Sequence, residues 1–372
     1  MTTDVLIRSV TAVPYRVPLR ATLTSALGAQ SHSNYGLVRL GVDDGVEGLG
    51  EISMIWHGDG ARLCAEVDDL LAPQIVGRPL FAYEAILADV RSALRFGRHS
   101  LAAVAAVEMA LLDAQGKVLG RPVVDLLGGS CASSIRLSMS LSIAAPDRML
   151  AEAQAYVEEG FTAVKVKSGR DRGHLVPVVA GLRAEHGPDL GIRVDLNMSC
   201  RTAKEALRVC TSLEPYDVLS VEQPLPPGDL AGSAFVRERT SVPIMVDEGV
   251  WHADDALAVL RAGAADLINV YVAESGGIRE ARRIADLAAL FGVEVAIGSM
   301  PETGVGTAAA AHLAFAVLGL EHPSDVAGFR YHDADVVHHE LTISGGHLLP
   351  PTTPGLGVHV DETALDRYRT QG

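Results

Sequence analysis

The pattern of hydrophobic and polar positions changes about one third of the way along the chain. Before about residue 130, residues 7–19 alternate as a strand does, and residues 35–51 predict a hairpin turned by Asp-Asp-Gly. Residues 100–119 form a long apolar run that ends at Gly120 and predicts a helix. We therefore expect a small α+β unit in this first part of the chain.

Two stretches of this first part are polar and contain glycine, namely Arg20–Ser33 and Trp56–Gly60. Segments of this composition usually run over the surface between regular elements. We therefore expect two exposed loops there.

From about Ile135 onward, short strand-like runs alternate with helix-like segments such as residues 203–213 and 278–292. Seven or eight such repeats of about 25 to 30 residues are what a (β/α) barrel requires. A doubly wound sheet is the competing fold, but no G-x-G-x-x-G motif follows the first strand of this region. The strand-like runs are residues 136–143, 163–169, 192–199, 218–225, 243–249, 267–275 and 293–300.

Charged residues stand near the carboxyl ends of successive predicted strands: Lys165 and Lys167, then Asp195, then Glu222, then Asp247. In a barrel these strand ends surround one site, so the residues would converge. A single acidic residue at a strand end is often a helix cap. Three carboxylates on three consecutive strands would repel one another unless they held a cation. An all-oxygen set of ligands favours Mg²⁺ over zinc.

The two lysines of AVKVKSG project from one face of their strand, because they alternate with valines. An isolated K-x-K pair more often lies on the solvent-exposed face of a half-buried strand. Beside a metal site, a neighbouring positive charge favours the neutral form of a lysine, so Lys167 can act as a base. Lys165 and Mg²⁺ would then stabilise the enediolate formed when a proton leaves the carbon beside a carboxylate.

Composition and charge argue against several classes of binding partner. The chain has 372 residues, a formal net charge of −15 and no run of basic residues, which argues against nucleic acid and anionic membranes as partners. No apolar run is long enough to span a membrane and the N-terminus lacks a signal-peptide core, so we expect a cytoplasmic protein. The four cysteines show no metal-like spacing and predict reduced thiols.

Several motifs together resemble the mandelate racemase/muconate lactonizing enzyme family of the enolase superfamily. They are AVKVKSG, RVDLNMS, VEQPL, VDEG, SGGI, GSMPETGVGTAAAAHLA and, upstream, AAVEMALLDAQGKVLGRPVVDLLGG. They follow the family order over nearly the whole chain. Enzymes of this superfamily use a lysine or histidine base together with Mg²⁺.

The resemblance implies an α/β fold: a modified (β/α)7β TIM barrel at residues 131–345, an N-terminal α+β capping domain at residues 1–130, and a segment at residues 346–372 that returns to the cap. It implies a symmetric homo-oligomer that acts on a small carboxylate. It also assigns roles to individual residues. Mg²⁺ would lie on Asp195, Glu222 and Asp247, with Lys167 as the acid/base and Lys165 as its electrophilic partner. Substrate would contact Trp56, His57, Asn197 and Ser299, and Glu302 would orient either the substrate or a loop backbone.

The sequence departs from the family on the sixth predicted strand. The muconate lactonizing subgroup usually carries a lysine there, in patterns such as I-N-I-K, whereas this chain reads INVYVAESGG. Tyr271 replaces that lysine, Glu274 replaces a later one, and Ser299 stands on the seventh strand where mandelate racemases have histidine. Tyr271 either takes part in the chemistry or fills the barrel interior.

A single lysine favours a one-base reaction, either β-elimination such as dehydration or a muconate-type cycloisomerisation. Racemisation with Tyr271 as the second base is the alternative within the family. Two other classes remain. A Schiff-base aldolase would also use a barrel lysine but has no need of three converging carboxylates. A non-catalytic carboxylate-binding protein would explain the missing base but not the intact lysine pair and acidic triad.

Overall fold

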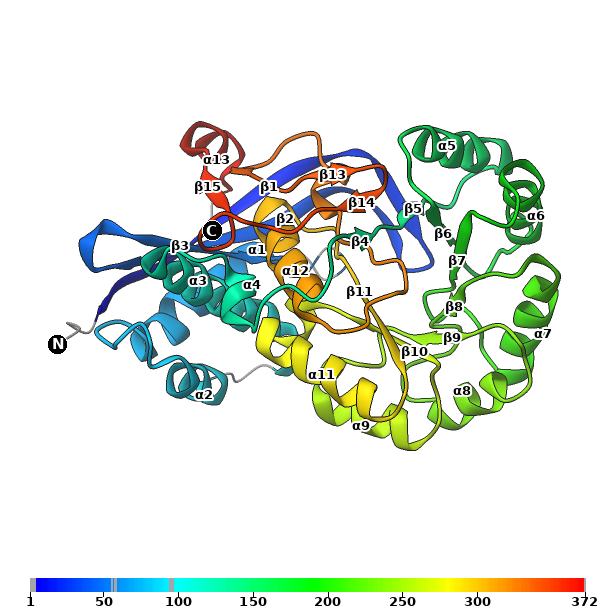
Figure 1. Ribbon diagram of the computed structural model, residues 1–372, viewed down its shortest axis with the longest axis horizontal. Coiled ribbons are helices and arrows are strands. Elements are labelled where there is room, and N and C mark those ends of the chain that lie inside the picture. Colours follow the sequence, from blue (N-terminus) through cyan, green and yellow to red (C-terminus); the bar gives the residue numbers. More distant parts are fainter. Residues whose placement is uncertain (1–4, 55, 57–58, 94–96, 371–372) are drawn as a thin grey trace.

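The computed structural model describes residues 5–54, 56, 59–93 and 97–370. These residues form an N-terminal sheet with its helices and a barrel of parallel strands beside it (Figure 1). No helix in the described part of the chain is long and apolar enough to cross a membrane. The barrel and the cap predicted from the sequence are confirmed.

The N-terminal sheet is antiparallel and contains β1 (Ile7–Ser25), β2 (Gly28–Val42) and β3 (Glu47–Ile52). The prediction of a loop at Arg20–Ser33 was wrong, because the β1–β2 hairpin extends through it, with Leu23 opposite Gln30. The register shifts between Pro18 and Leu23, where the chain bulges and then resumes pairing. This long hairpin brings the cap over the barrel.

Helix α3 (Leu101–Leu119) joins the two parts of the molecule. It is predominantly apolar and is buried from Leu101 to Gly116, as expected of a helix with packing partners all around it. It ends at Gly120, which adopts the left-handed conformation (φ 63°) favoured by glycine. Gly50 lets β3 approach this helix closely, because a Cβ there would lie 1.8 Å from the carbonyl oxygen of Ala106. The other helices of this part are α1 (Gly60–Glu66), α2 (Tyr83–Ala93) and α4 (Val123–Leu126).

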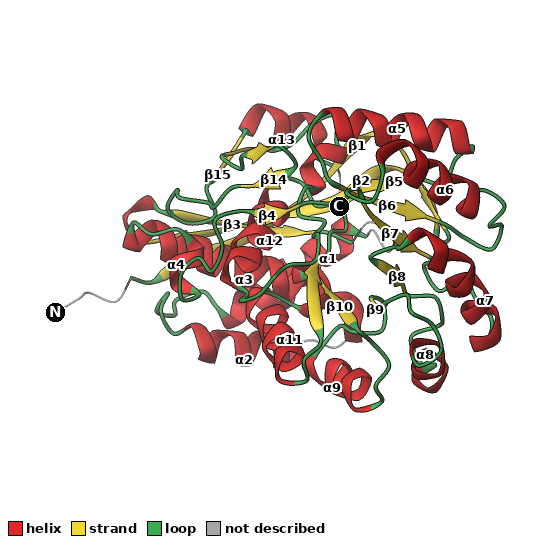
Figure 2. Cartoon of the chain, turned by 45° about the vertical axis from the view of Figure 1, so that its right-hand side comes forward, coloured by secondary structure: helices red, strands yellow, loops and turns green. Residues whose placement is uncertain are grey.

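The barrel sheet contains seven parallel strands in sequential order, with the helices on its outer side (Figure 2). The strands are β5 (Met139–Leu141), β6 (Ala163–Lys167), β7 (Gly191–Asp195), β8 (Ser220–Glu222), β9 (Ile244–Val246), β10 (Leu267–Val270) and β11 (Glu294–Ile297). The helices are α5 (Pro146–Glu158), α6 (Leu175–His186), α7 (Ala203–Leu213), α8 (Leu230–Arg237), α9 (Ala253–Arg261), α10 (Val272–Ser275), α11 (Ile278–Leu290) and α12 (Gly304–Ala316).

The barrel is closed by a short extended segment between β11 and β5. The backbone N–H of Asp325 donates to the carbonyl of Ile297 on β11, and the N–H of Ser138 donates to the carbonyl of Ser324. This segment occupies the place of an eighth strand. It therefore carries Asp325 into the barrel interior.

Two predicted strands differ from the observed ones. Residues 136–143 divide between β4 (Ile135–Arg136), which pairs outside the barrel, and β5. The run at residues 267–275 ends as a strand at Val270 and continues as the short helix α10. Its apolar residues serve a buried helix equally well, and a short apolar run does not distinguish the two.

The C-terminal segment lies against the N-terminal part (Figure 1). The N–H of Thr370 donates to the carbonyl of Pro14, and the N–H of Leu356 donates to Asp113 on α3. These contacts tie the end of the chain to the cap. The elements of this region are β12 (Val337–His339), β13 (Ile343–Ser344), β14 (His347–Leu348), β15 (Val358–Val360) and α13 (Glu362–Tyr368).

Candidate active site

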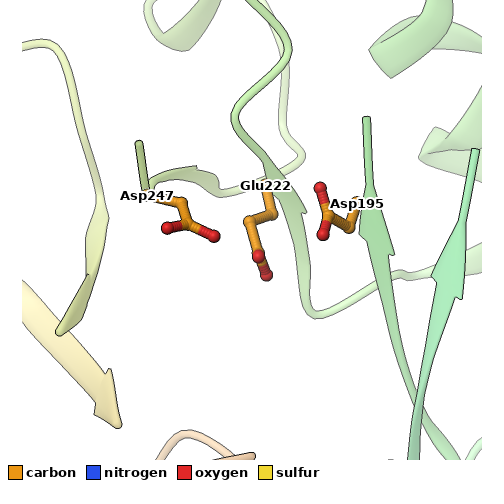
Figure 3. Close-up of side chains that lie close together, drawn as sticks. All are labelled: Asp195, Glu222 and Asp247. Atoms are coloured by element: carbon orange, nitrogen blue, oxygen red, sulfur yellow. The ribbon is translucent and has the colours of Figure 1, made fainter. Parts of the chain in front are cut away.

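Three carboxylates face one another at the carboxyl ends of consecutive barrel strands (Figure 3). Asp195 ends β7, Glu222 ends β8, and Asp247 directly follows β9. Asp195 and Glu222 are partners in the strand register, so the sheet itself sets them side by side. One oxygen from each residue lies within 4.8 Å of the other two, and all three side chains are buried. The sequence-predicted triad is therefore assembled.

Among the three carboxylates, only Glu222 has its pKa lowered overall, by neighbouring cationic side chains. Burial, and then the neighbouring Glu222, raise the pKa of Asp195, while burial together with Glu248 and Glu222 raises the pKa of Asp247. Burial opposes the ionisation of Glu222 too, but Lys165 and Arg193 hold its pKa well below the usual range. Buried carboxylates that repel one another in this way are suited to a divalent cation.

Lys165 lies inside the barrel in an ion-pair network. Its Nζ is 2.6 Å from Asp325 and 3.3 Å from Glu222, and burial is outweighed by these two carboxylates, which raise its pKa. The Arg193 guanidinium bridges the same partners, at 2.8 Å from each. Lys165 is thus held in place as a cation. Because Asp325 and Glu222 offset most of its charge, its electrostatic effect on Lys167 is smaller than that of an unpaired ammonium group.

Lys167 is two residues further along β6 and is more accessible. Its Nζ is 2.5 Å from Asp195, and 17% of its side chain is exposed, against 4% for Lys165. It lines a cavity that extends between the barrel and the cap hairpin. Lys165 reaches the same cavity, so a bound ligand can meet both ammonium groups.

Tyr271 is the residue between the sixth barrel strand and helix α10, and its side chain is buried. Its hydroxyl donates to Asp247 at 2.9 Å and accepts from Asn269 at 3.0 Å. Burial, and then Asp247, raise its pKa well above the ordinary value. Gly298 makes room for the ring, since a Cβ there would lie 2.3 Å from it. Tyr271 is therefore a neutral phenol in contact with a carboxylate of the triad.

Of the predicted substrate contacts, some line the cavity and others are hydrogen-bonded to neighbouring protein groups. Trp56 and Ser299 line the cavity beside Lys167, whereas His57 lies outside the described residues. The Asn197 side-chain amide donates to Glu248, and its backbone N–H donates to Asp195. Glu302 accepts from the Ser299 hydroxyl and from the Met300 N–H, so it holds the loop after β11.

Sequence reasoning missed four polar residues of the site: Arg193, Glu248, Asn269 and Asp325. Arg193 and Asn269 each stand two residues before a predicted site residue, so strand alternation would have placed them on the same inward face. Glu248 follows Asp247 directly. Asp325 carried no signal, because the segment that closes the barrel has no strand-like pattern.

The fold and the site together define a barrel enzyme with a cap, an acidic triad that could bind a metal, and a pair of lysines facing it. Two family models match the chain. Residues 7–128 match the mandelate racemase/muconate lactonizing enzyme N-terminal domain, and residues 148–364 match the enolase C-terminal domain-like family. The chain therefore belongs to the mandelate racemase/muconate lactonizing enzyme family of the enolase superfamily and is an enzyme.

Known relatives catalyse several reactions. The chain is 33% identical over 353 residues to L-Ala-D/L-Glu epimerase of Bacillus subtilis (strain 168), a match that covers 93% of this chain and 94% of that protein. It is 32% identical over 363 residues to o-succinylbenzoate synthase of Geobacillus kaustophilus, covering 95% and 93%. A crystal structure of muconate lactonizing enzyme from Pseudomonas fluorescens complexed with muconolactone superposes with a TM-score of 0.92 at 29% identity, covering 99% of this chain and 100% of that one.

Proposed function

We propose that this enzyme removes the proton next to the carboxylate of a small carboxylic acid with one base, Lys167, and completes a β-elimination such as dehydration. The observation that carries the proposal is Tyr271. It occupies the sixth-strand position of the second lysine, and its hydroxyl proton is donated to Asp247. Among the described residues that line the cavity, Lys165 and Lys167 are the only lysines.

The residues at the strand ends fit Mg²⁺. Asp195, Glu222 and Asp247 would hold the ion, because they offer only oxygen ligands and their mutual repulsion needs a cation to offset it. When bound, Mg²⁺ would stabilise the negative charge that develops on the substrate carboxylate. Tyr271 and Asn269 would orient Asp247 through their hydrogen bonds.

The two lysines would have different roles, stabilisation of charge for Lys165 and proton transfer for Lys167. The ammonium group of Lys165, fixed by Glu222 and Asp325, would contact the substrate carboxylate and stabilise its added charge. Lys167 would take the α-proton, and the resulting ammonium group would give a proton to the leaving group on the adjacent carbon. The α C–H and β C–O bonds break, a C=C bond forms, and the hydroxyl leaves as water. One base on one face suffices for this sequence.

A muconate-type cycloisomerisation is the second candidate. It also needs only one acid/base, and the similarity to muconate lactonizing enzyme over the whole chain favours it. In that direction Lys167 would donate a proton to the α-carbon after ring closure. Both reactions leave Tyr271 outside the proton transfer.

The test uses the Mg²⁺-loaded protein in D₂O with pools of hydroxy acids, amino acids, N-acyl amino acids and muconates, followed by proton NMR. We expect loss of substrate and appearance of product, without inversion of the α-carbon. Lys167→Ala should lower the rate by at least about 10³-fold, because the proposed proton acceptor is removed. Lys204→Ala, on the exposed face of α7, is the matched control and should leave the rate unchanged.

Exchange of the α-proton with inversion would show that a second base acts, and would replace the one-base mechanism by racemisation. Full activity of Lys167→Ala would refute the role of Lys167. Trapping of a substrate by borohydride would point instead to a Schiff base.

A further inference from the structure

The cavity that Lys165 and Lys167 line adjoins a second pocket, which shares Trp56, Lys167 and Ser299 with it and whose wall is acidic and aromatic. Glu248 and Glu274 line it, beside Trp56 and Trp251. The chain has only two tryptophans, and both lie here. Lys167 is the one cationic residue among the described residues that line this part, and its ammonium group is already paired with Asp195.

Glu274 is the unusual member of this wall. Its side chain is 3% exposed, and one of its carboxylate oxygens is buried without a hydrogen-bond partner in the described chain. Glu248 accepts from Asn197 through one oxygen, while its other oxygen is buried without a partner among the described residues. A buried carboxyl group without a partner destabilises the protein. Such groups are retained where a ligand completes them.

The carboxyl group of Glu274 is buried beside other carboxyl groups, which disfavour its ionisation when no cation is bound. Burial, and then Glu248 and Glu302, raise its pKa well above the ordinary value. A positive charge placed in the cavity would relieve this repulsion. The two indole rings would add to its binding, because the faces of tryptophan rings attract ammonium groups.

We propose that the substrate carries a positively charged nitrogen as well as its carboxylate, so that it is an amino acid with a free or alkylated amine, and that Glu274 and Glu248 with the two tryptophans hold this nitrogen. The inference rests on the proposed function, in which the carboxylate lies between Lys165 and the acidic triad. A positively charged nitrogen favours the ionised form of these two carboxyl groups and pairs with it, whereas a second carboxylate or an N-acyl group on the substrate does not.

Binding can be measured directly, since both tryptophans line the cavity and report on it by fluorescence. The wild-type protein with Mg²⁺ is titrated with α-amino acids and their N-methyl forms, and with the N-acetyl forms of the same acids. We expect the cationic acids to bind at least about tenfold tighter than their N-acetyl partners. Equal or tighter binding of the N-acetyl forms, or no binding of any cationic acid, would overturn the inference.

The variant Glu274→Gln keeps the shape of the side chain and removes its charge. We expect it to lose the preference for cationic acids by about tenfold or more, with circular dichroism unchanged. Glu294→Gln, at the exposed start of β11, is the matched control and should keep the preference. An unchanged preference in Glu274→Gln would remove Glu274 from the recognition of charge.

A metal ion is the other cation that these carboxylates could bind. Two Mg²⁺ ions per wild-type chain and one in Glu274→Gln would mean that Glu274 holds a metal, which would overturn the inference. Proton exchange at the α-carbon is followed separately by NMR. Tight binding of cationic acids without any exchange would refute the proposed reaction and leave the inference standing.

Discussion

At the scale of single residues, Tyr271 decides what the active site can do. A lysine at this position would face Asp247 as a cation and could serve as a second acid or base. The phenol is instead neutral, donates to Asp247 and accepts from Asn269. In the proposed mechanism this position therefore orients a carboxylate of the triad and takes no part in proton transfer.

Tyr271→Phe should therefore weaken Mg²⁺ binding rather than abolish the reaction. Removing a hydrogen bond to a metal-binding carboxylate typically lowers metal affinity by about 10- to 100-fold. We expect the rate at saturating Mg²⁺ to fall less than about tenfold, because Lys167 is untouched. Mg²⁺ titrations of the rate separate the two effects. A loss of about 10³-fold at saturating Mg²⁺ would make the hydroxyl part of the chemistry.

At the scale of elements, the turn after Tyr271 fixes the cap helix α3 to the barrel. Gly277, the residue before α11, has φ 128° and ψ 170°, a conformation that is essentially restricted to glycine. A Cβ at Gly277 would lie 1.3 Å from Oε2 of Glu108 on α3. Glu108 also accepts from the N–H of Arg279 in the first turn of α11. Close backbone approach thus couples the cap to the sixth-strand loop.

Gly277→Ala should destabilise the protein by about 3 kcal/mol or more, because a strained backbone and a clash with Glu108 act together. Gly292→Ala is the control, since Gly292 also has positive φ but its Cβ would meet nothing within 4 Å. That variant should lose only about 1–2 kcal/mol. Urea unfolding measures both free energies. Equal losses would show that the approach of α3 is unimportant.

At the scale of the whole molecule, buried carboxyl groups make the free energy of unfolding depend on pH. Burial raises the pKa of Glu108 to about 7, although Tyr83 and Arg279 donate hydrogen bonds to it. Burial and the neighbouring carboxylates likewise raise the pKa of Asp195 and Asp247 in the absence of a cation. Protons or cations that bind to the folded state at these groups stabilise it.

The contribution of Glu108 to the free energy of unfolding should fall as pH rises. Its pKa in the folded protein, about 7, exceeds the ordinary value of 4.5, so the folded state binds more protons between these values. The stabilisation is complete below pH 4.5 and is lost as pH passes 7. Glu108→Gln should flatten this slope in urea unfolding from about pH 5 to 8, while Glu185→Gln, on the exposed side of α6, should not.

Mg²⁺ should stabilise the folded protein by mass action. At a free concentration of about 100 times Kd, the gain is about 2.7 kcal/mol. Asp195→Asn should remove it, because one of the three carboxylates is lost, and the exposed Asp189→Asn should keep it. Thermal unfolding with and without chelator measures the shift. An equal shift in Asp195→Asn would place the ion elsewhere.

The amino-acid sequence by itself determined the barrel, the acidic triad and the lysine pair. Strand–helix alternation predicts the barrel, and a barrel brings the ends of its strands to one place, so the alternation also predicts that Asp195, Glu222 and Asp247 lie together. The helix at residues 101–119 and its end at Gly120 also followed from local chemistry. These features follow from the periodicity of hydrophobic residues along the chain and from the topology of the barrel.

Only the tertiary structure decided the environment of each group. Asp325 reaches Lys165 from a segment without any strand pattern, and Arg193 acquires its role from partners 29 and 132 residues away. The cap hairpin extends through a stretch that looked like a loop, because pairing across the turn outweighs its composition. Hydrogen-bond partners, burial and charge compensation are set by contacts distant in sequence, and no local pattern encodes them.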